Sequence, residues 1–329
     1  LKKFGKNNFS LGGELYLLDW QLEGDIDRRT AFKWFAPDLQ LVLMGKKMSL
    51  NVFVNGTPQV PANYQLQAIV DPQAVTNIRL GNPDLTPAFR YNLSTFTRFS
   101  DEFAGFSVSL NGSSSYVDNV LGDDLSFIDG RPLYIDQNLS HQWQQAFNFR
   151  VDQRLDLIKA SIGVNSKVNL TSGPGSFAGV TVDNNFAGYS FGVNATKTLN
   201  DDSFLRIGYN RGFTRQFFDT GENTIIKTDY HNLSTTFQLE VNENWRLETD
   251  FGLTSYGGAA FAVPTTLLLW SLNLEIRPFK NQPHYFTITG HDLLNQNRNV
   301  SRTAEAFYTR SSTTNSLGRY AMISFHWKL

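Results

Sequence analysis

Apolar and polar residues alternate with a period of two through most of this chain, and this pattern constrains the fold more than any other feature. The last stretch, 317–329, shows it well, because one side of it carries Ala321, Ile323, Phe325, Trp327 and Leu329. Successive residues of a β-strand point to opposite faces, so the pattern predicts a strand with one apolar face. Both a soluble sandwich and a transmembrane β-barrel contain such strands, and the rest of the chain has to distinguish them.

The same alternation recurs from Gly13 onward, with almost no helical periodicity. The alternating segments lie at about 14–21, 30–36 leading into 38–45, 48–55, 89–99, 104–118, 139–151, 158–168, 183–198, 203–217, 226–241, 245–251, 266–276, 283–291 and 317–329. They predict roughly fourteen strands. Most exceed the length of about five or six residues that is typical of soluble sheets, and they are long enough for a tilted membrane strand.

The connections between these segments alternate between short and long. The short polar turns are 45–47, 100–102, 152–154, 200–202, 242–244 and 280–282. The longer links are 56–88, 119–138, 171–182, 218–225, 257–263 and 293–316. Strict alternation places every long link at one end of an up-and-down sheet, as in outer-membrane barrels with short periplasmic turns. We therefore predict one domain over 1–329, an up-and-down antiparallel transmembrane β-barrel in the bacterial outer membrane with a periplasmic C-terminus.

Composition agrees with this prediction. The net charge is −1, which gives no bulk attraction to nucleic acid, and the absence of cysteine excludes disulfides, thiolate zinc sites and cysteine nucleophiles. Aromatic residues make up 14% and charged residues only 18%. No run approaches the roughly 18 apolar residues of a membrane helix. The chain begins Leu1-Lys2-Lys3 without a signal-peptide pattern, so we expect a mature or recombinant product, or the later part of a longer chain.

Aromatic side chains are expected near the segment ends of the apolar face, where barrels carry interfacial girdles. These residues are Tyr91, Phe99, Tyr189, Phe213, Phe217 and Trp245. Charged residues of both signs are expected on the lumen face. They are Arg90, Arg98, Arg150, Lys159, Lys167, Arg206, Glu240, Arg246, Glu248, Asp250, Glu275 and Arg277. Some of them could hold a plug by charge-assisted hydrogen bonds, or they could simply line a solvated wall.

Catalytic chemistry and a resident metal are not expected. No two histidines of the chain have the spacing of metal ligands, such as His-x-x-x-His. The five histidines are His141, His231, His284, His291 and His326. The local candidates for a hydrolase are Ser140 with His141, and Asp229 with His231. Oxygen ligands for calcium could come from Asp123-Asp124 or Asp201-Asp202, but solvated turns are the simpler interpretation.

Gly173-Pro174-Gly175 lacks the ending and the following helix of a phosphate loop, so it predicts a flexible outer loop. We therefore predict neither enzymatic activity nor a cofactor.

Three short motifs resemble those of a known family. Gly81 to Pro87 (GNPDLTP) resembles the GNPDLKPE signature of TonB-dependent receptor barrels, and departs from it at Thr86 and Ala88. Asp292 to Asn297 with Val300-Ser301-Arg302 resembles the penultimate loop of Bacteroidetes-type outer-membrane β-barrels. Leu317 to Tyr320, leading to Phe325, resembles their final strand. For the residues themselves a structural role is favoured: Pro83 and Pro87 would stiffen a loop, and Asp292 could pair with Arg302.

The resemblance implies energised uptake of a bulky nutrient ligand. Complete members of the family have an N-terminal plug and a barrel of about 22 strands. An open sheet would leave two unpaired edges in lipid, so the strands present either belong to a larger barrel, which we prefer, or close on themselves. The expected partners are outer-membrane lipid, a plug domain, the TonB energy-coupling complex, the barrel-assembly machinery and a surface lipoprotein, and no nucleic acid. The alternative is a barrel without a plug that acts as a passive pore or as an accessory subunit of an envelope complex.

Overall fold

The computed structural model is a single large β-sheet, and it describes residues 2–4, 7–22, 28–68, 78–219, 223–259, 261, 265–278, 284–297, 299–304, 309–314 and 317–327. Its elements are β1 (Lys2–Phe4), β2 (Asn7–Leu22), β3 (Arg28–Met44), β4 (Met48–Gln59), α1 (Asn63–Leu66), β5 (Ile78–Leu80), β6 (Ala88–Asp101), β7 (Phe106–Ile128), β8 (Arg131–Leu155), η1 (Asp156–Ile158), β9 (Ala160–Phe177), β10 (Val180–Asn200), β11 (Ser203–Asp219), β12 (Asn223–Asn242), β13 (Trp245–Gly257), β14 (Thr265–Ile276), β15 (Tyr285–His291), β16 (Asn299–Ala304), β17 (Thr309–Thr314) and β18 (Tyr320–His326). No helix in these residues is long and apolar enough to cross a membrane.

Fifteen strands follow one another in a single antiparallel path that starts at β1 and ends at β18. Each long strand of this path overlaps a segment predicted from the alternation, so the predicted count of about fourteen strands is close. The short β5 is added in parallel beside β8, and β16 pairs only with β17. An up-and-down order follows from the short turns, because a tight hairpin can join only antiparallel neighbours.

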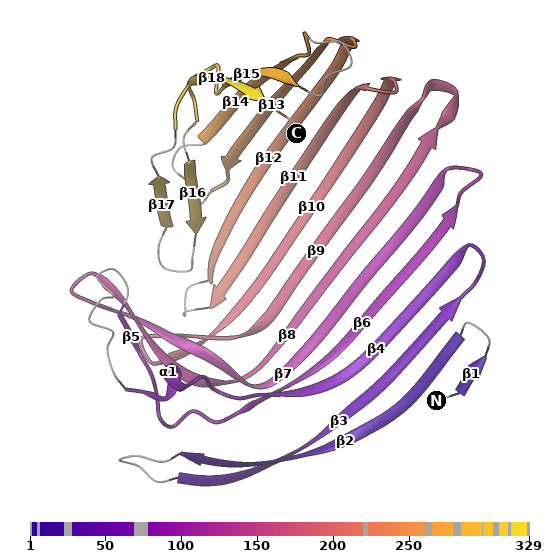
Figure 1. Ribbon diagram of the computed structural model, residues 1–329. Coiled ribbons are helices and arrows are strands. Elements are labelled where there is room, and N and C mark those ends of the chain that lie inside the picture. The colour runs from indigo at the N-terminus through magenta and orange to yellow at the C-terminus, as the bar shows by residue number, and fades with distance from the viewer. Residues whose placement is uncertain are drawn as a thin grey trace.

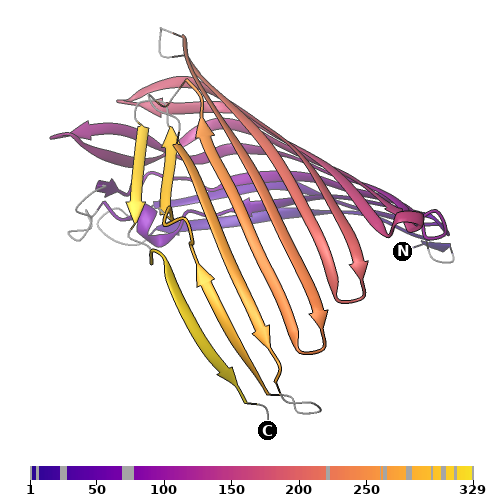
Figure 2. The same cartoon turned by 90° about the horizontal axis from the view of Figure 1, so that it is seen from above.

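The sheet is strongly curved and open in the described residues. Figures 1 and 2 show a trough in which β2 and β3 lie at one rim and β15 and β18 lie at the other. No pairing joins β1 to β18 within the part of the chain that the structure describes. Curvature of this kind follows from the right-handed twist that accumulates across many long strands.

The register divides every strand into two faces. Residues directly opposite each other on neighbouring strands point the same way, so one face can be followed from strand to strand. What we call the outer face is apolar, with Leu39, Val54, Leu93, Leu110, Phe149, Phe191, Leu233, Leu253, Leu274, Ile288 and Ile323 among its residues. The six aromatics predicted for a girdle all belong to it.

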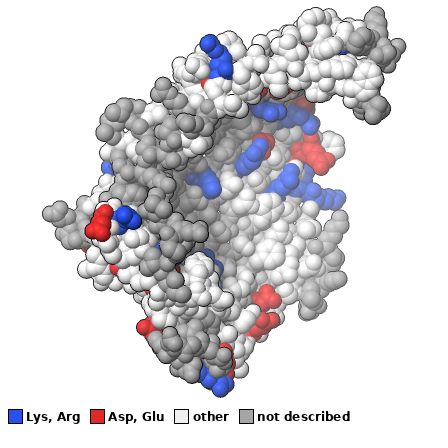
Figure 3. Space-filling model, turned by 60° about the vertical axis from the view of Figure 1, so that its left-hand side comes forward, with Lys and Arg blue, Asp and Glu red and all other residues white. Residues whose placement is uncertain are grey.

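The inner face is polar. Its residues include Asn92, Ser113, Asn148, Lys167, Asn210, Asn232, Asp250 and Thr287. All the charged residues predicted for the lumen alternate on this face within strands, except for Lys159, which lies in a turn, and Arg277, which follows β14. Figure 3 looks into the hollow of the trough, where Lys and Arg side chains are scattered over the wall and Asp and Glu gather beside some of them.

Two long connections were predicted wrongly as loops. Residues 119–138 continue β7 and β8 as a hairpin that turns at Asp129-Gly130, where φ is 51° and 75°. Residues 171–182 continue β9 and β10 to a turn at Ala178-Gly179, where φ is 50° and 78°. Positive φ at both central residues is the geometry of a two-residue hairpin turn, whose twist matches that of its strands. Gly173-Pro174-Gly175 is therefore paired strand, not a flexible loop.

Two short turns fall later than predicted. The turn expected at 100–102 lies at 102–105, and Gly105 adopts a φ of 59°. The turn expected at 152–154 lies at η1, because β8 continues to Leu155. Charged residues in this part of β8 form ion pairs with each other within the strand, because Arg150 pairs with Asp152 at 2.7 Å. A polar run therefore did not mark the end of the strand. The turn expected at 280–282 lies outside the described residues.

The final strand is shorter than its alternating pattern. The pattern covers 317–329, whereas β18 spans Tyr320–His326 and Leu329 is not among the described residues. Ile323 is 74% exposed and lies with Phe325 on the outer face, as the alternation predicts.

Candidate ligand pocket at the mouth of the trough

The alternation of the connections gathers the longer ones at one end of the sheet, which we call the long-connection end. There the β7–β8 hairpin extends past the neighbouring strands and bends over the hollow (Figure 1). The bend coincides with Asn119, whose φ of 55° interrupts the ladder between the Asp118–His141 and Val120–Leu139 pairs. Asparagine tolerates this left-handed conformation better than most residues, which fits its position at the bend.

The bent hairpin is held against the β9–β10 hairpin by one buried carboxylate. Asp124 accepts hydrogen bonds from the Ser176 hydroxyl at 2.6 Å and from the Gly179 backbone N–H at 3.0 Å. The backbone of β7 also runs parallel to the end of β9, and the Ala178 N–H donates to the Leu125 carbonyl at 2.9 Å. A buried hydrogen-bonding group is costly to leave without its partner, so this contact fixes the hairpin as a roof over the hollow.

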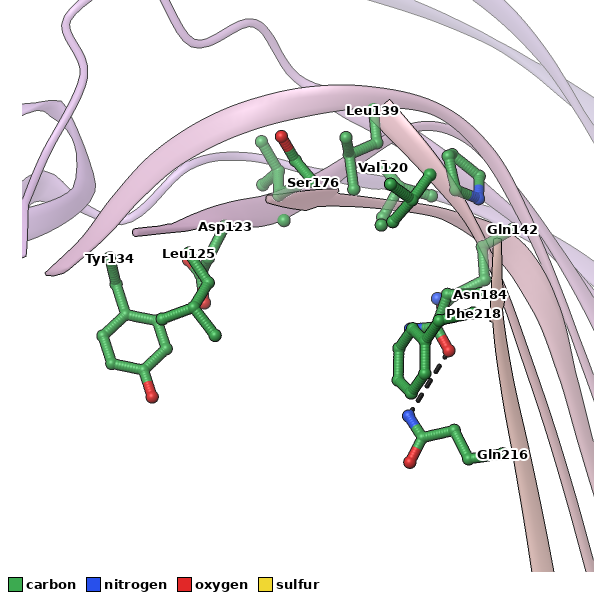
Figure 4. Close-up of a pocket in the computed structure, with 15 residues that line it drawn as sticks. Val120, Asp123, Leu125, Tyr134, Leu139, Gln142, Ser176, Asn184, Gln216 and Phe218 are labelled. Carbon is green, nitrogen blue, oxygen red and sulfur yellow. Dashed lines mark hydrogen bonds between the residues drawn. The ribbon is translucent and has the colours of Figure 1, made fainter. Parts of the chain in front are cut away.

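A pocket of about 450 Å³ lies under this roof. Figure 4 shows Tyr134, Leu125 and Asp123 on one side of it, and Gln142, Asn184, Gln216 and Phe218 on the other. The Gln216 amide donates to Asn184 Oδ1 at 3.3 Å. Val182, Asn184, Gln216 and Phe218 belong to the inner face, so the pocket opens onto the trough. Aromatic and amide side chains around a concave space are the usual lining of a ligand site.

An ion network stands beside the pocket. Arg79 of β5 binds Asp136 and Asp123, both at 2.6 Å, and Gln65 donates to Asp136 at 3.1 Å. Asp136 is 1% exposed, and Asp123 lies directly opposite it on the neighbouring strand. The repulsion between these two neighbouring carboxylates is offset because the Arg79 guanidinium pairs with both of them.

The two carboxyls of this network have pKa values that move in opposite directions. Burial raises the pKa of Asp123 to about 6 against the attraction of Arg79, and the neighbouring Asp136 adds to the rise. Burial also works to raise the pKa of Asp136, but the bonds from Arg79 and Gln65 outweigh it and hold that pKa below its ordinary value. Asp123 is therefore the group that takes up a proton first as the pH falls.

The GNPDLTP motif anchors this network to the wall. The Thr86 N–H donates to Asn138 Oδ1 at 2.8 Å, and the Asn138 amide donates back to the Thr86 carbonyl at 2.9 Å. Asn119 donates to the Pro87 carbonyl at 3.0 Å. Leu85 and Phe89 are 1% and 0% exposed. These contacts join the loop to the base of the roof hairpin, so residues of the motif have a structural role there.

Gly81 is the one residue of the motif whose small size is required. A Cβ there would lie 2.4 Å from the Gln67 carbonyl oxygen and 2.7 Å from those of Tyr64 and Gln65. No side chain fits that approach, since the atoms it would meet belong to the backbone.

The predicted acidic pairs have different environments. Asp123 and Asp124 do not form a solvated turn, because both lie in a paired strand and are engaged as described above. Asp201 and Asp202 do form an exposed turn. No group of His, Asp and Glu side chains able to hold a metal ion was found in the described residues.

Neither hydrolase candidate has the geometry of a Ser–His pair. His231 Nε2 lies 3.5 Å from the Asp229 carboxylate, and His231 Nδ1 is hydrogen-bonded to the Tyr209 hydroxyl at 2.8 Å. His141 contacts the Tyr116 ring, with 6.0 Å between ring centroids. Ser140 and His141 are neighbours on a strand, and adjacent strand residues point to opposite faces. No nucleophile–base hydrogen bond therefore links the candidates that the sequence suggested.

Asp292 shapes the penultimate loop through the backbone. It is 0% exposed and accepts hydrogen bonds at 2.9 Å from the N–H groups of Gln296 and Asn297. The side chain of Arg302, its predicted partner, is not described. The buried carboxylate explains why the motif begins with an aspartate.

The comparisons with known proteins concern the fold. No protein-family model matches the chain, and no curated protein matches it. The crystal structure of a mutant of the ferric enterobactin receptor from Pseudomonas aeruginosa superposes with a TM-score of 0.52 and 8% identity, over 93% of this chain and 46% of that one. The chain thus spans about half the length of that receptor structure. The likeness concerns the fold alone, which is that of a long segment of β-barrel wall.

Two further structures give looser superpositions. The toluene transporter of P. putida has a TM-score of 0.31 at 9% identity, over 96% of this chain and 87% of its own. A FadL homologue of P. aeruginosa has a TM-score of 0.32 at 10% identity, over 97% and 85%. At these scores the overlap does not bear on a particular family.

Proposed function

We propose that the chain forms much of the wall of an outer-membrane receptor of the TonB-dependent kind, which takes up a bulky nutrient ligand. The three motifs of the sequence and the long superposition on a receptor of that kind support the proposal. The trough gives it a physical basis, because its outer face is apolar and its inner face is polar, as lipid and a wet lumen require.

The roofed pocket is the observation that carries the proposal. It lies at the long-connection end, where the trough opens, and the β7–β8 hairpin covers it. Its amide and aromatic side chains suit a neutral ligand rich in hydroxyl or amide groups, which exchanges hydrogen bonds with Gln142, Asn184 and Gln216 while stacking on Tyr134 or Phe218. Captured there, the ligand would stand at the entrance to the lumen.

The open edges fit a wall that is completed by other strands. A membrane sheet cannot leave its outermost strands unpaired in lipid, and the path ends at β1 and β18. In our proposal further strands bring the barrel toward about 22, and a plug held by inner-face charges such as Arg98 and Arg246 closes its lumen. The short-turn end and the C-terminus then face the periplasm, where the TonB complex acts.

Conductance in a planar lipid bilayer tests this function. The complete protein, purified in detergent and inserted into a bilayer, should show no steady open current, because a plug fills the lumen. A steady ohmic current would overturn the gated receptor. It would support the alternative, a passive pore, to which the polar inner face is equally suited.

A further inference from the structure

The outer face is apolar along most of its area, but it carries a cluster of cations on β11 and β12. Arg211 and Arg215 alternate with Phe213 on the outer face of β11, and the register places Lys227 beside them on β12. Charge on a lipid-facing surface is costly at the membrane centre and tolerated near its boundary. These residues lie toward the long-connection end, since β11 stops at Asp219.

Two of these cations face each other directly. Arg215 pairs with Lys227 in the register, and Ala187 lies on the other side of Arg215. Like charges directly opposite each other destabilise a sheet unless something neutralises them. No carboxylate forms an ion pair with Arg211, Arg215 or Lys227 in the described part of the chain.

Among the described residues of this face, Asp229 is the carboxylate nearest to the cations, because it is two residues from Lys227 and diagonal to Arg211 and Arg215 in the register. Asp229 lies opposite Phe213, and its carboxylate is 3.5 Å from His231. Asp183 and Asp219 face each other at the strand tips, four residues beyond Arg215, which is about 13 Å along the strand. Three cations therefore stand against one nearby carboxylate, which contacts His231, and the net charge around Arg215 and Lys227 is positive.

A groove of about 470 Å³ adjoins Arg215 on the same face. Trp143 and Phe217 form its aromatic sides, Leu170 adds an apolar wall, and Ala187 leaves the space between them. Trp143 and Leu170 pair with residues of the outer face in the register, so the groove is open to the side that lipid would cover and is separate from the mouth pocket. Its depth comes from the small side chain of Ala187 between larger neighbours.

We propose that this groove binds a phosphorylated lipid of the membrane leaflet at the long-connection end. The phosphate would lie between Arg215 and Lys227, which relieves their repulsion, and an acyl chain would fill the groove between Trp143 and Phe217. Arg211, whose guanidinium stacks 4.5 Å above the Phe213 ring, extends the positive surface. A lone anion explains the cations, but only a lipid explains cations and an apolar groove on one lipid-facing surface. The inference rests on the membrane placement in the proposed function, but not on transport.

Native mass spectrometry of the complete protein in detergent tests the site. The protein is titrated with dioleoyl phosphatidic acid, with dioleoyl phosphatidylcholine and with inorganic phosphate. We expect one phosphatidic acid to bind at least about tenfold more tightly than phosphatidylcholine, because charge-assisted bonds to two cations favour an anionic headgroup. Arg215→Gln and Lys227→Gln should each reduce that preference, and Ala187→Trp should weaken binding of both lipids by filling the groove.

Matched variants separate the site from general effects. Arg206→Gln removes an arginine from the inner face of the same strand, and Ala195→Trp enlarges a residue of the outer face near the other end of β10. Both should bind lipid like the wild type. Extraction from membranes and the gel mobility of the folded form show whether each variant is assembled. If one single variant does not assemble, the remaining single variants still test the site.

Three results would overturn the proposal. Equal binding of the two lipids would remove the role of the cations. Displacement of phosphatidic acid by inorganic phosphate at equal concentration would show an adventitious anion site. Unchanged binding in Ala187→Trp would place the acyl chain elsewhere. Each of these can occur in a protein that is normally inserted and gated, so the lipid site and the receptor function fail separately.

Discussion

At the scale of single residues, Asp123 makes the roof hairpin sensitive to pH. Its pKa of about 6 in the folded protein lies above the ordinary 3.8, so the folded state binds a proton more tightly than the unfolded hairpin. Protonation therefore stabilises the hairpin as the pH falls through about 6, and this contribution is lost as the pH rises through the same value. Hydrogen exchange of the β7–β8 hairpin, corrected for the intrinsic rate, should be slower at pH 5 than at pH 7.5. Asp123→Asn should remove the difference, and stronger protection at pH 7.5 would contradict the assignment.

Asn138 is the residue on which the GNPDLTP motif depends. Its amide serves both the N–H and the carbonyl of Thr86, so Asn138→Ala leaves two backbone groups without their partner. We expect local destabilisation of about 1–3 kcal/mol, measured as faster hydrogen exchange at 85–90. Asn148→Ala, on the inner face of the same strand, is the control and should leave this segment unchanged. Equal exchange in the two variants would mean that the motif is held by its buried apolar residues alone.

The pocket and the ion network beside it could not be predicted at this scale, because their residues meet only through the fold. Arg79 and Asp136 are 57 positions apart in the chain, and no local pattern indicates that they touch. The motif did indicate a structured loop, since Asn-Pro-Asp favours a turn, and Asn82 Oδ1 accepts from the Asp84 N–H. Alternation did indicate which face most charges occupy. The outer-face cations of β11 were missed because Arg211 and Arg215 break the apolar pattern that Phe213 continues on that face.

At the scale of elements, the roof depends on the contact between two hairpins. Asp124→Ala removes the acceptor for Ser176 and Gly179, and we expect it to release the β7–β8 hairpin without unfolding the wall. The local stability of the hairpin should fall by about 1–3 kcal/mol, the range for leaving a buried hydrogen-bonding group without its partner. Limited proteolysis at the Asp129-Gly130 turn should become faster. Asp118→Ala, an exposed position on the same strand, should be cut at the wild-type rate, and equal rates for the two variants would show that Asp124 does not hold the roof.

The strands were predictable and their ends were not, for a physical reason. Alternation reports burial on one face, and it fades where a hairpin leaves the wall and both faces become partly polar. Residues 119–138 were therefore interpreted as a loop although Asp129-Gly130, a strong hairpin signal, lies near their centre. The same applies to Asp152 and Arg154, which lie in β8 and form ion pairs with Arg150 of the strand and Asp156 of η1.

At the scale of the molecule, the two faces of the trough explain the composition of the chain. Few charged residues and many aromatics fit a wall that is wetted on one side only. Of this architecture, the sequence allowed prediction of the strand order, the faces and the end at which long connections gather. The curvature and the path of the roof arise from twist summed over many strands, which no single segment contains.

The orientation of the faces in the membrane can be tested with two adjacent residues of β8. Phe147 points to the outer face and Ala146 to the inner face, where Ser113 and Asn169 are its register partners. Phe147→Arg would place a charge in lipid and should cost about 2–4 kcal/mol if the residue lies at mid-membrane, whereas a polar lumen accepts Ala146→Arg. Folded protein recovered from detergent-extracted membranes should fall sharply for Phe147→Arg and stay near the wild type for Ala146→Arg. The opposite order would mean that the apolar face is not the lipid face, and equal yields, with recovery from the soluble fraction, would indicate a sheet that does not enter the membrane.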